Sequence, residues 1–226
     1  MMTDPVTLAF DTSGPFCAAA LLRADGHLVT RQEDMTRGQG ERLMVLLEEL
    51  LESEGVTWAD LDAIAVGTGP GNFTGIRIAV SAARGLALGL NVPAIGVSGF
   101  QSAAFGMDNV IACIPAPRDQ AYVQVLVSGA DPSPALIDLN DIRAFPDVPV
   151  QTKPRFCGPA ALDVATAYLG RTLSEDEIAP QSVSPIEAIV RIGAAQSHAT
   201  TTRPAPLYVR PADAAPSREA PPVILP

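Results

Sequence analysis

The chain has 226 residues, of which 47% are hydrophobic and 18% are charged, and its net charge is -10. This composition predicts a globular protein with one core or two small ones, and it argues against a disordered chain. Because a negative field repels phosphate, we do not expect the chain alone to bind nucleic acid.

Three further features of the sequence argue against a secreted, a membrane-spanning or a metal-binding protein. No basic segment followed by a long apolar run opens the sequence, and no stretch of about 18 uninterrupted apolar residues occurs, so neither a signal peptide nor a membrane span is predicted. Cys17, Cys113 and Cys157 are far apart and odd in number, which indicates buried thiols in a reducing cytoplasm. His27 and His198 lack partners at metal-ligand spacing, so no metal is predicted.

Apolar runs and turn signals predict a first half with the element order βββαβαβα. Asp25-Gly26 is typical of a hairpin between the second and third strands, and Gly55 is expected to end the first helix. Thr74 is expected to cap the second helix. The predicted strands lie at 6–10, 16–23, 27–32, 62–67 and 92–97, and the predicted helices at 38–54, 74–90 and 98–105.

The second half begins in the same way, about 100 residues later, which indicates an internal duplication. Its predicted strands lie at 109–114, 122–128, 135–139 and 155–157, and its predicted helices at 141–145, 160–169 and 184–198. Two facing βββαβα halves describe an α/β fold of the actin-like class (ASKHA, ribonuclease H-like). We assign 1–105 to an N-terminal half, 106–211 to a diverged C-terminal half and 212–226 to a proline-rich tail.

The loop at 67–77, GTGPGNFTGIR, lies between a predicted strand and a predicted helix, where backbone amides can bind a phosphate. It lacks the Lys-Ser/Thr of a Walker loop, and Pro70 and Asn72 break the spacing of a dinucleotide-binding loop. The alternative is a structural corner, with close packing at Gly71 and Gly75 and with Arg77 bonding back to the loop. We favour the corner, formed by Gly67, Gly69, Pro70, Gly71, Asn72, Phe73, Thr74, Gly75 and Arg77.

Residues 67–104 resemble the TsaB (YeaZ) family of bacterial proteins for biosynthesis of threonylcarbamoyladenosine in tRNA. The stretch GTGPGNFTGIRIAVSAARGLALGLNVPAIGVSGFQSAA carries the resemblance, together with LAFDTSGPFCAAALL at 8–22 and PAPLYVR at 204–210. The chain departs from the family pattern at Ile114-Pro115-Ala116-Pro117, where an Ile-Asp-Ala-Arg run is expected. It departs again at 37–40, where relatives often carry a histidine.

The resemblance implies an actin-like fold and a non-catalytic subunit without a cofactor. This subunit would pair with a TsaD-type catalytic paralogue, and a small TsaE-type ATPase would join the pair. The complex would place threonylcarbamoyl on the adenosine beside the tRNA anticodon, and tRNA would be bound only through the complex. Alone, the chain would form a homodimer, with no membrane contact.

An actin-like nucleotide site needs one strand-turn element from each half. Asp11, Thr12 and Ser13 supply the first, whereas Pro115 and Pro117 supply neither a carboxylate nor an N–H group to the second. We therefore predict a degenerate nucleotide site in which Asp11 is a turn residue. The older glycoprotease label of this superfamily has no support in the sequence, because no three metal ligands are placed together. A small-molecule phosphotransferase of the same fold is the alternative function.

The two long helices of the first half are the predicted partner interface. Leucines of the first helix spread over roughly 160° of the helical wheel, which is wider than one core contact needs. Gly85 and Gly89 lie in a helix interior, where glycine costs roughly 1 kcal/mol relative to alanine and so needs a reason. The predicted interface consists of Leu43, Leu46, Leu47, Leu50, Ile78, Ala79, Ala82, Gly85, Leu86 and Gly89.

Overall fold

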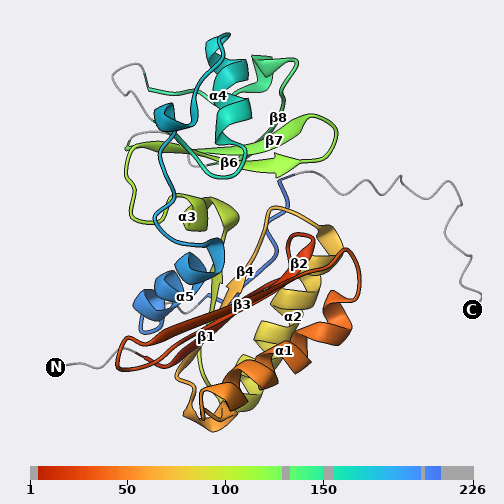
Figure 1. Cartoon of the computed structure of the whole chain (residues 1–226), viewed down its shortest axis with the longest axis vertical. Helices are drawn as coiled ribbons and strands as arrows, with labels where there is room; N and C mark the ends of the chain where they lie inside the picture. Colours follow the sequence, from red (N-terminus) through yellow and green to blue (C-terminus); the bar gives the residue numbers. More distant parts are fainter. Residues whose placement is uncertain (1–4, 129–132, 150–154, 200–201, 210–226) are drawn as a thin grey trace, which may run out of the picture.

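The computed structural model describes residues 5–128, 133–149, 155–199 and 202–209, and Figure 1 shows two sheets, one above the other, with helices around them. The first sheet has five strands in the order β3-β2-β1-β4-β5. Strand β1 pairs antiparallel with β2 and parallel with β4, which places it in the middle of the sheet. The strands are β1 (Thr7–Asp11), β2 (Phe16–Leu22), β3 (Leu28–Asp34), β4 (Ala63–Gly67) and β5 (Ala94–Val97).

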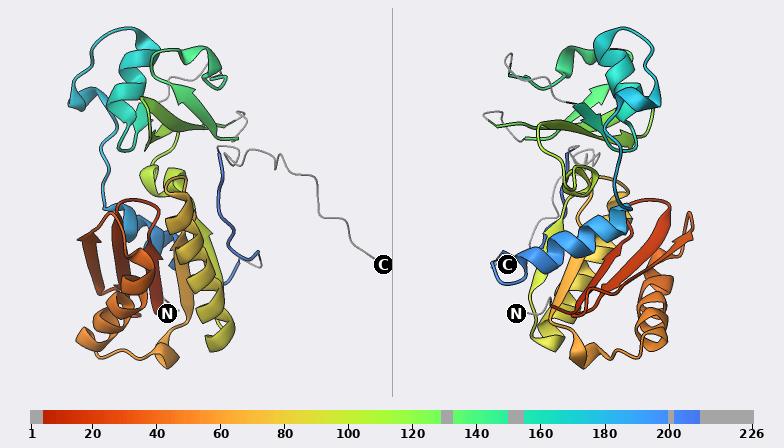
Figure 2. Two further views of the ribbon diagram at one scale, coloured as in Figure 1. Left: turned by 90° about the vertical axis from the view of Figure 1, so that its right-hand side faces the viewer. Right: turned by 60° about the vertical axis from the view of Figure 1, so that its left-hand side comes forward.

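Helices cover both faces of the first sheet (Figures 1 and 2). The helices α1 (Gln39–Ser53) and α2 (Phe73–Leu90) lie on one face, and their leucines and alanines form one buried cluster with the strands. The helix α5 (Pro185–Gln196) lies on the other face, where Ile186, Ile189 and Val190 are buried against small side chains of β1, β2 and β4. The small side chains on this face of the sheet allow α5 to approach closely.

The second sheet repeats the strand order of the first, as β8-β7-β6-β9. Its strands are β6 (Val110–Ala116), β7 (Gln120–Leu126), β8 (Ala135–Asp138) and β9 (Arg155–Cys157). The helix α4 (Ala161–Leu169) covers one face, and the short helix α3 (Gly99–Ala103) packs on the other. In both sheets the third, second, first and fourth strands follow one another in space, so the predicted duplicated actin-like plan is confirmed.

Two segments of the second half of the sequence pack against the first half. Helix α5 follows the second sheet in the chain but packs on the first one, and the segment 202–209 also returns to the first half, where the Leu207 amide donates to the Thr68 carbonyl at 2.8 Å. The division of the chain into halves at residue 105 therefore describes the proposed sequence repeat and does not separate two independently packed units. The tail predicted at 212–226 lies outside the described residues.

Most predicted elements are observed, with boundaries shifted by one to a few residues, and two details are wrong. The N-cap of α2 is Asn72 and not Thr74, because the Asn72 carbonyl oxygen accepts a hydrogen bond from the Gly75 amide. The predicted helix at 141–145 is a single 3₁₀ turn at Ile142–Ala144. Two further 3₁₀ turns, at Trp58–Asp60 and Glu175–Glu177, were not predicted.

The prediction of buried thiols is confirmed, since all three cysteines are free and buried. Burial raises the pKa of Cys17 to about 11 and that of Cys157 to about 12. Helix α2 is long and apolar enough to cross a membrane by length and composition alone, and it is the one such helix among the described residues. In the structure its inner face packs on the first sheet, and its outer face carries Arg77 and Arg84. The apolar residues on its outer face are therefore better explained by a contact with another protein than by a membrane.

Candidate functional site

Asp11 ends β1 and fixes the turn that follows. Its carboxylate accepts hydrogen bonds from the amide of Ser13 at 2.8 Å and from the Ser13 hydroxyl at 3.0 Å. Burial is the main influence on this carboxyl group and raises its pKa, while the bonds from Ser13 act in the opposite direction. Gly67 lies so close that a β-carbon there would overlap the Asp11 carboxylate. These contacts are those of a turn residue, and among the described residues no cluster of three His, Cys, Asp or Glu could hold a metal ion.

The glycine-rich loop packs its backbone tightly against the turn after β1. The Asn72 amide donates to the Ser13 carbonyl at 2.6 Å, and β-carbons at Gly71 and Gly75 would overlap the carbonyl oxygens of Ser13 and Thr12. The amides of Asn72 and Gly75 are thus already bonded within the protein. A phosphate cradle needs such amides to be free and convergent, so the loop geometry supports the corner interpretation.

Arg77 does not bond back to the loop as predicted. Its Nε donates to the Tyr208 hydroxyl at 2.7 Å, and its guanidinium carbon lies 3.7 Å from the centre of the Phe73 ring. Phe73 and Tyr208 also contact each other, with ring centres 5.0 Å apart. Because Arg77 lies one turn after Phe73 on the outer surface of α2, its side chain reaches the C-terminal segment and holds that segment to the helix.

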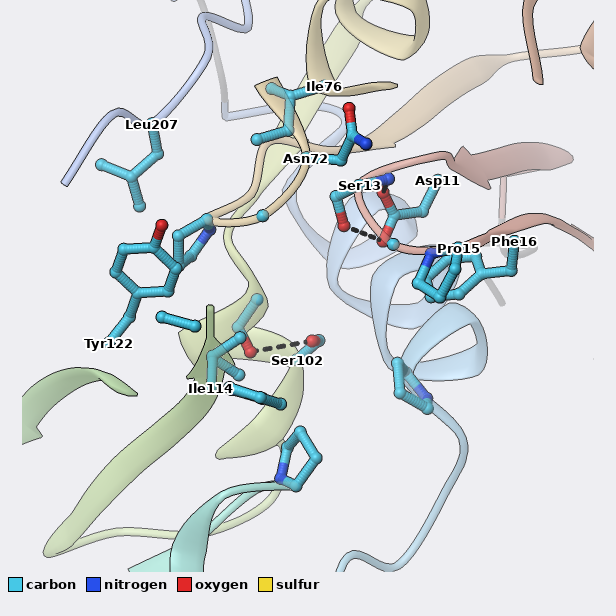
Figure 3. Close-up of a pocket in the computed structure, with 18 of the residues that line it drawn as sticks. Asp11, Ser13, Pro15, Phe16, Asn72, Ile76, Ser102, Ile114, Tyr122 and Leu207 are labelled. Carbon is cyan, nitrogen blue, oxygen red and sulfur yellow. Dashed lines mark hydrogen bonds between the residues drawn. The ribbon is translucent and has the colours of Figure 1, made fainter. Parts of the chain in front are cut away.

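A cleft of about 1290 Å³ separates the two halves at these turns (Figure 3). Asp11, Ser13 and Phe16 line it from the first half, and Ile114 and Tyr122 line it from the second. On the second wall Pro115 lies near the end of β6 and Pro117 lies in the turn between β6 and β7, where an actin-like site would need polar groups. No Lys, Arg or His is found among the described residues that line the cleft, so this part of the lining offers no side-chain cation to a phosphate chain.

Five of the ten predicted interface residues are buried and cannot contact a partner. Leu43, Leu46, Leu47, Leu50 and Ala79 are all buried in the core of the first half, so their assignment to an interface is wrong. The wide apolar arc of α1 has a different cause, because this helix packs against β2 with one side and against α2 with the other. Two contacts within the chain need a wider arc than one.

The other five predicted residues do reach the surface. Ile78, Ala82 and Leu86 are half-buried, and Gly85 and Gly89 are exposed, with no atom within 4 Å of a β-carbon built at either glycine. Close packing within the chain therefore does not explain these glycines. The sequence prediction missed three exposed apolar residues of the same helices: Met44, Val45 (46% exposed) and Leu88 (81% exposed). Leu88 could have been found from the apolar residues that α2 carries outside its buried side.

The shared strand order of the two sheets defines the class, an actin-like α/β protein, and comparison with solved structures finds relatives of similar fold. Two crystal structures from Pseudomonas aeruginosa match almost the whole chain. One, described as an uncharacterised protein with similarity to peptidase YEAZ, has a TM-score of 0.68 and 26% identity and covers 91% of this chain and all of its own. The other, YeaZ, has a TM-score of 0.63 and 27% identity over 90% of this chain and 99% of its own.

Sequence comparison finds similarity to proteins that modify tRNA. The model of the family TsaD, tRNA N6-adenosine threonylcarbamoyltransferase, matches residues 33–131. The Escherichia coli threonylcarbamoyladenosine biosynthesis protein TsaB is 36% identical over 121 residues, 51% of this chain and 52% of that protein. The chain thus spans about half the length of such curated relatives, whereas an uncharacterised Mycobacterium tuberculosis protein matches over 92% of this chain and 93% of its own at 29% identity. The chain is therefore similar to TsaB (YeaZ) proteins in sequence and in fold.

Proposed function

We propose that this chain is a non-catalytic subunit that binds and activates a TsaD-type catalytic paralogue in the threonylcarbamoylation of the adenosine beside the tRNA anticodon. The names of its TsaB relatives support the pathway, and the match of residues 33–131 to the TsaD family supports kinship with the catalytic subunit. The cleft gives no support to the alternative, a phosphotransferase, because its described lining offers no cation to a phosphate.

The observation that carries the proposal is the outward surface of α1 and α2. It presents the exposed Met44 and Val45 on α1 and, on α2, the exposed Leu88 with the two open glycines, Gly85 and Gly89. Each glycine destabilises the helix by roughly 1 kcal/mol relative to alanine, and no packing within the chain offsets this. Small residues on a helix allow a second helix to approach closely, and exposed apolar surface of this kind marks protein interfaces.

The remaining assignments follow from this surface and from the charge. A second copy of the chain would cover it in a homodimer, and the paralogue would replace that copy in the working complex. A TsaE-type ATPase would join through the complex. The tRNA would also be bound through the complex, since a net charge of -10 on this chain disfavours direct contact with phosphates. We place the complex in the cytoplasm, without a cofactor held by this chain.

Co-purification with the TsaD-type paralogue tests the proposal. Leu88→Glu and Ala82→Glu place a charge on the outward surface, and both are expected to reduce recovery of the paralogue at least tenfold while leaving the circular dichroism spectrum unchanged. Leu169→Glu is the control, because it is the same substitution at another exposed leucine, which is 48% exposed and lies on α4. Recovery at the wild-type level with both folded variants would place the interface elsewhere. Leu47→Glu is unsuitable, because Leu47 is fully buried.

A further inference from the structure

The cleft between the halves is almost free of charge. Of the described residues that line it, Asp11 is the one carboxylic acid, and none is Lys, Arg or His. The carboxylate of Asp11 is itself engaged, because it accepts the amide and the hydroxyl of Ser13. A ligand cation would therefore meet a carboxylate that already has partners, and a ligand anion would meet no opposite charge.

The helix ends at the cleft do not change this balance. The amino-terminal turns of α2 and α5 contribute Phe73, Thr74, Pro185 and Ile186 to the lining. Their positive ends would favour an anion, but each is capped within the chain. The Asn72 side chain accepts from the Gly75 amide in α2, and the Ser184 side chain accepts from the Glu187 amide in α5.

The rest of the lining is largely apolar and comes from both halves. Ile76, Ile114 and Ile186 belong to α2, β6 and α5, and the aromatic rings of Phe16 and Tyr122 lie on opposite walls (Figure 3). The volume of about 1290 Å³ exceeds the roughly 300–1,000 Å³ of ordinary small-molecule sites. Ser13, Asn72 and Ser102 add a few hydrogen-bonding groups that could orient a ligand.

We infer that the cleft binds an uncharged small molecule with an apolar ring system, in the place where actin-like enzymes hold a charged nucleotide. This inference is independent of the proposed function, since the cleft and the outward surface of α1 and α2 are lined by different residues. Charge complementarity carries it, because burial of an unpaired charge is far more costly than burial of a hydroxyl group.

Methyl NMR of the full chain, labelled at isoleucine δ1, tests the inference with three probes that share one ring and differ in charge: 4-phenylbutanol, 4-phenylbutylamine and 4-phenylbutanoate. The alcohol is expected to shift the methyl signals of Ile76, Ile114 and Ile186, and to leave those of Ile64, Ile111 and Ile137, which lie outside the cleft, in place. We expect it to bind roughly tenfold more tightly than either charged probe.

Two variants locate the site and test the role of Asp11. Ile114→Glu should abolish the shifts at Ile76 and Ile186, and Leu169→Glu, on the outer surface of α4, should not. Asp11→Asn should leave the affinity for the alcohol within about threefold of the wild type, because the ligand does not depend on its charge. The wild-type shift map remains a test even if a variant fails to fold.

Four outcomes would overturn the inference. The first is no shift with any probe up to its solubility limit. The second is tighter binding of the amine that is lost in Asp11→Asn, which would make the cleft a cation site. The third is a shift of the three cleft methyls by ATP and Mg²⁺. The fourth is a shift of the same methyls, without any probe, when residues 210–226 are deleted, which would assign the cleft to the chain's own C-terminal segment.

Discussion

The hydroxyl group of Thr12 donates a hydrogen bond to the carbonyl oxygen of Gly75 at 2.7 Å, between two residues that lie 63 positions apart in the chain. Both residues are buried, and the bond joins the turn after β1 to the first turn of α2. It orients α2, and with it the outward surface proposed as the interface, relative to the first sheet.

Removal of this hydrogen bond should destabilise the protein without changing its shape. Thr12→Val keeps the volume of the side chain but deletes the donor, and we expect the free energy of unfolding in urea to fall by about 1–2 kcal/mol. Thr12→Ser keeps the hydroxyl and is the control, with a smaller loss caused by the missing methyl group. An unchanged urea midpoint in Thr12→Val would show that the bond does not contribute to stability.

Two glycines of the same helix should respond to alanine in opposite directions. Gly75→Ala forces a β-carbon against the Thr12 carbonyl and should cost more than about 2 kcal/mol of stability, because backbone cannot move aside easily. Gly85→Ala meets open space and should stabilise the isolated chain by up to about 1 kcal/mol. Thermal unfolding of both variants, followed by circular dichroism at low protein concentration, measures the contrast. Equal effects at the two positions would contradict the corner geometry of the loop.

The buried carboxyl group of Asp11 should give stability a distinct dependence on pH. Because burial raises its pKa in the folded state, its favourable contribution is fully present below the unfolded pKa, near 3.9, and is lost as pH rises through the raised folded pKa. The stability of Asp11→Asn relative to the wild type should therefore increase as pH rises above about 4. Urea unfolding at a series of pH values measures this difference.

Asp60 supplies the control of opposite sign for that experiment. Its pKa is lowered by hydrogen bonds from the hydroxyl and the amide of Thr57, so its contribution is present above the unfolded pKa and is lost as pH falls. Asp60→Asn should therefore destabilise the protein at neutral pH and lose this effect on acidification. Parallel pH profiles for the two variants would contradict the assignment for Asp11.

The contact between Arg77 and Tyr208 should hold the C-terminal segment to α2. Tyr208→Ala removes both the hydrogen bond and the ring contact with Phe73, and the Leu207 amide, which donates to the Thr68 carbonyl, should exchange its hydrogen about tenfold faster. Tyr208→Phe keeps the ring contact and should have an intermediate effect. If exchange at Leu207 is the same in all three proteins, the segment is held by other contacts.

The sequence allowed the order of elements to be predicted, because strand and helix periods are properties of neighbouring residues. The strand at Arg155–Cys157 was predicted without error, and Gly55 ends α1 through a left-handed backbone conformation as expected. The turn role of Asp11 could also be predicted, since aspartate bonds to amides two residues ahead.

Contacts between distant segments could not be predicted from the same patterns. The apolar arc from Leu43 to Leu51 suggests an interface in the sequence, because the helix period shows which residues share a side but not how many neighbours cover that side. Arg77 was assigned to the loop because Tyr208, its actual partner, lies 131 residues further along the chain. The apolar cleft was missed for the same reason, since its two walls come from different halves.

The packing of α5 on the first sheet makes the order of synthesis matter for this protein. Ala65 on β4 lies so close to Gly193 of α5 that no β-carbon would fit between them, and the apolar face formed by Ala9, Ala63 and Ile95 is covered by residues after 185. A nascent chain that has left the ribosome only as far as the second sheet would expose that face to water. The first sheet therefore cannot complete this side of its core during translation until α5 (Pro185–Gln196) has emerged, and until then it presents an apolar surface on which chaperones, or other unfolded chains, can bind.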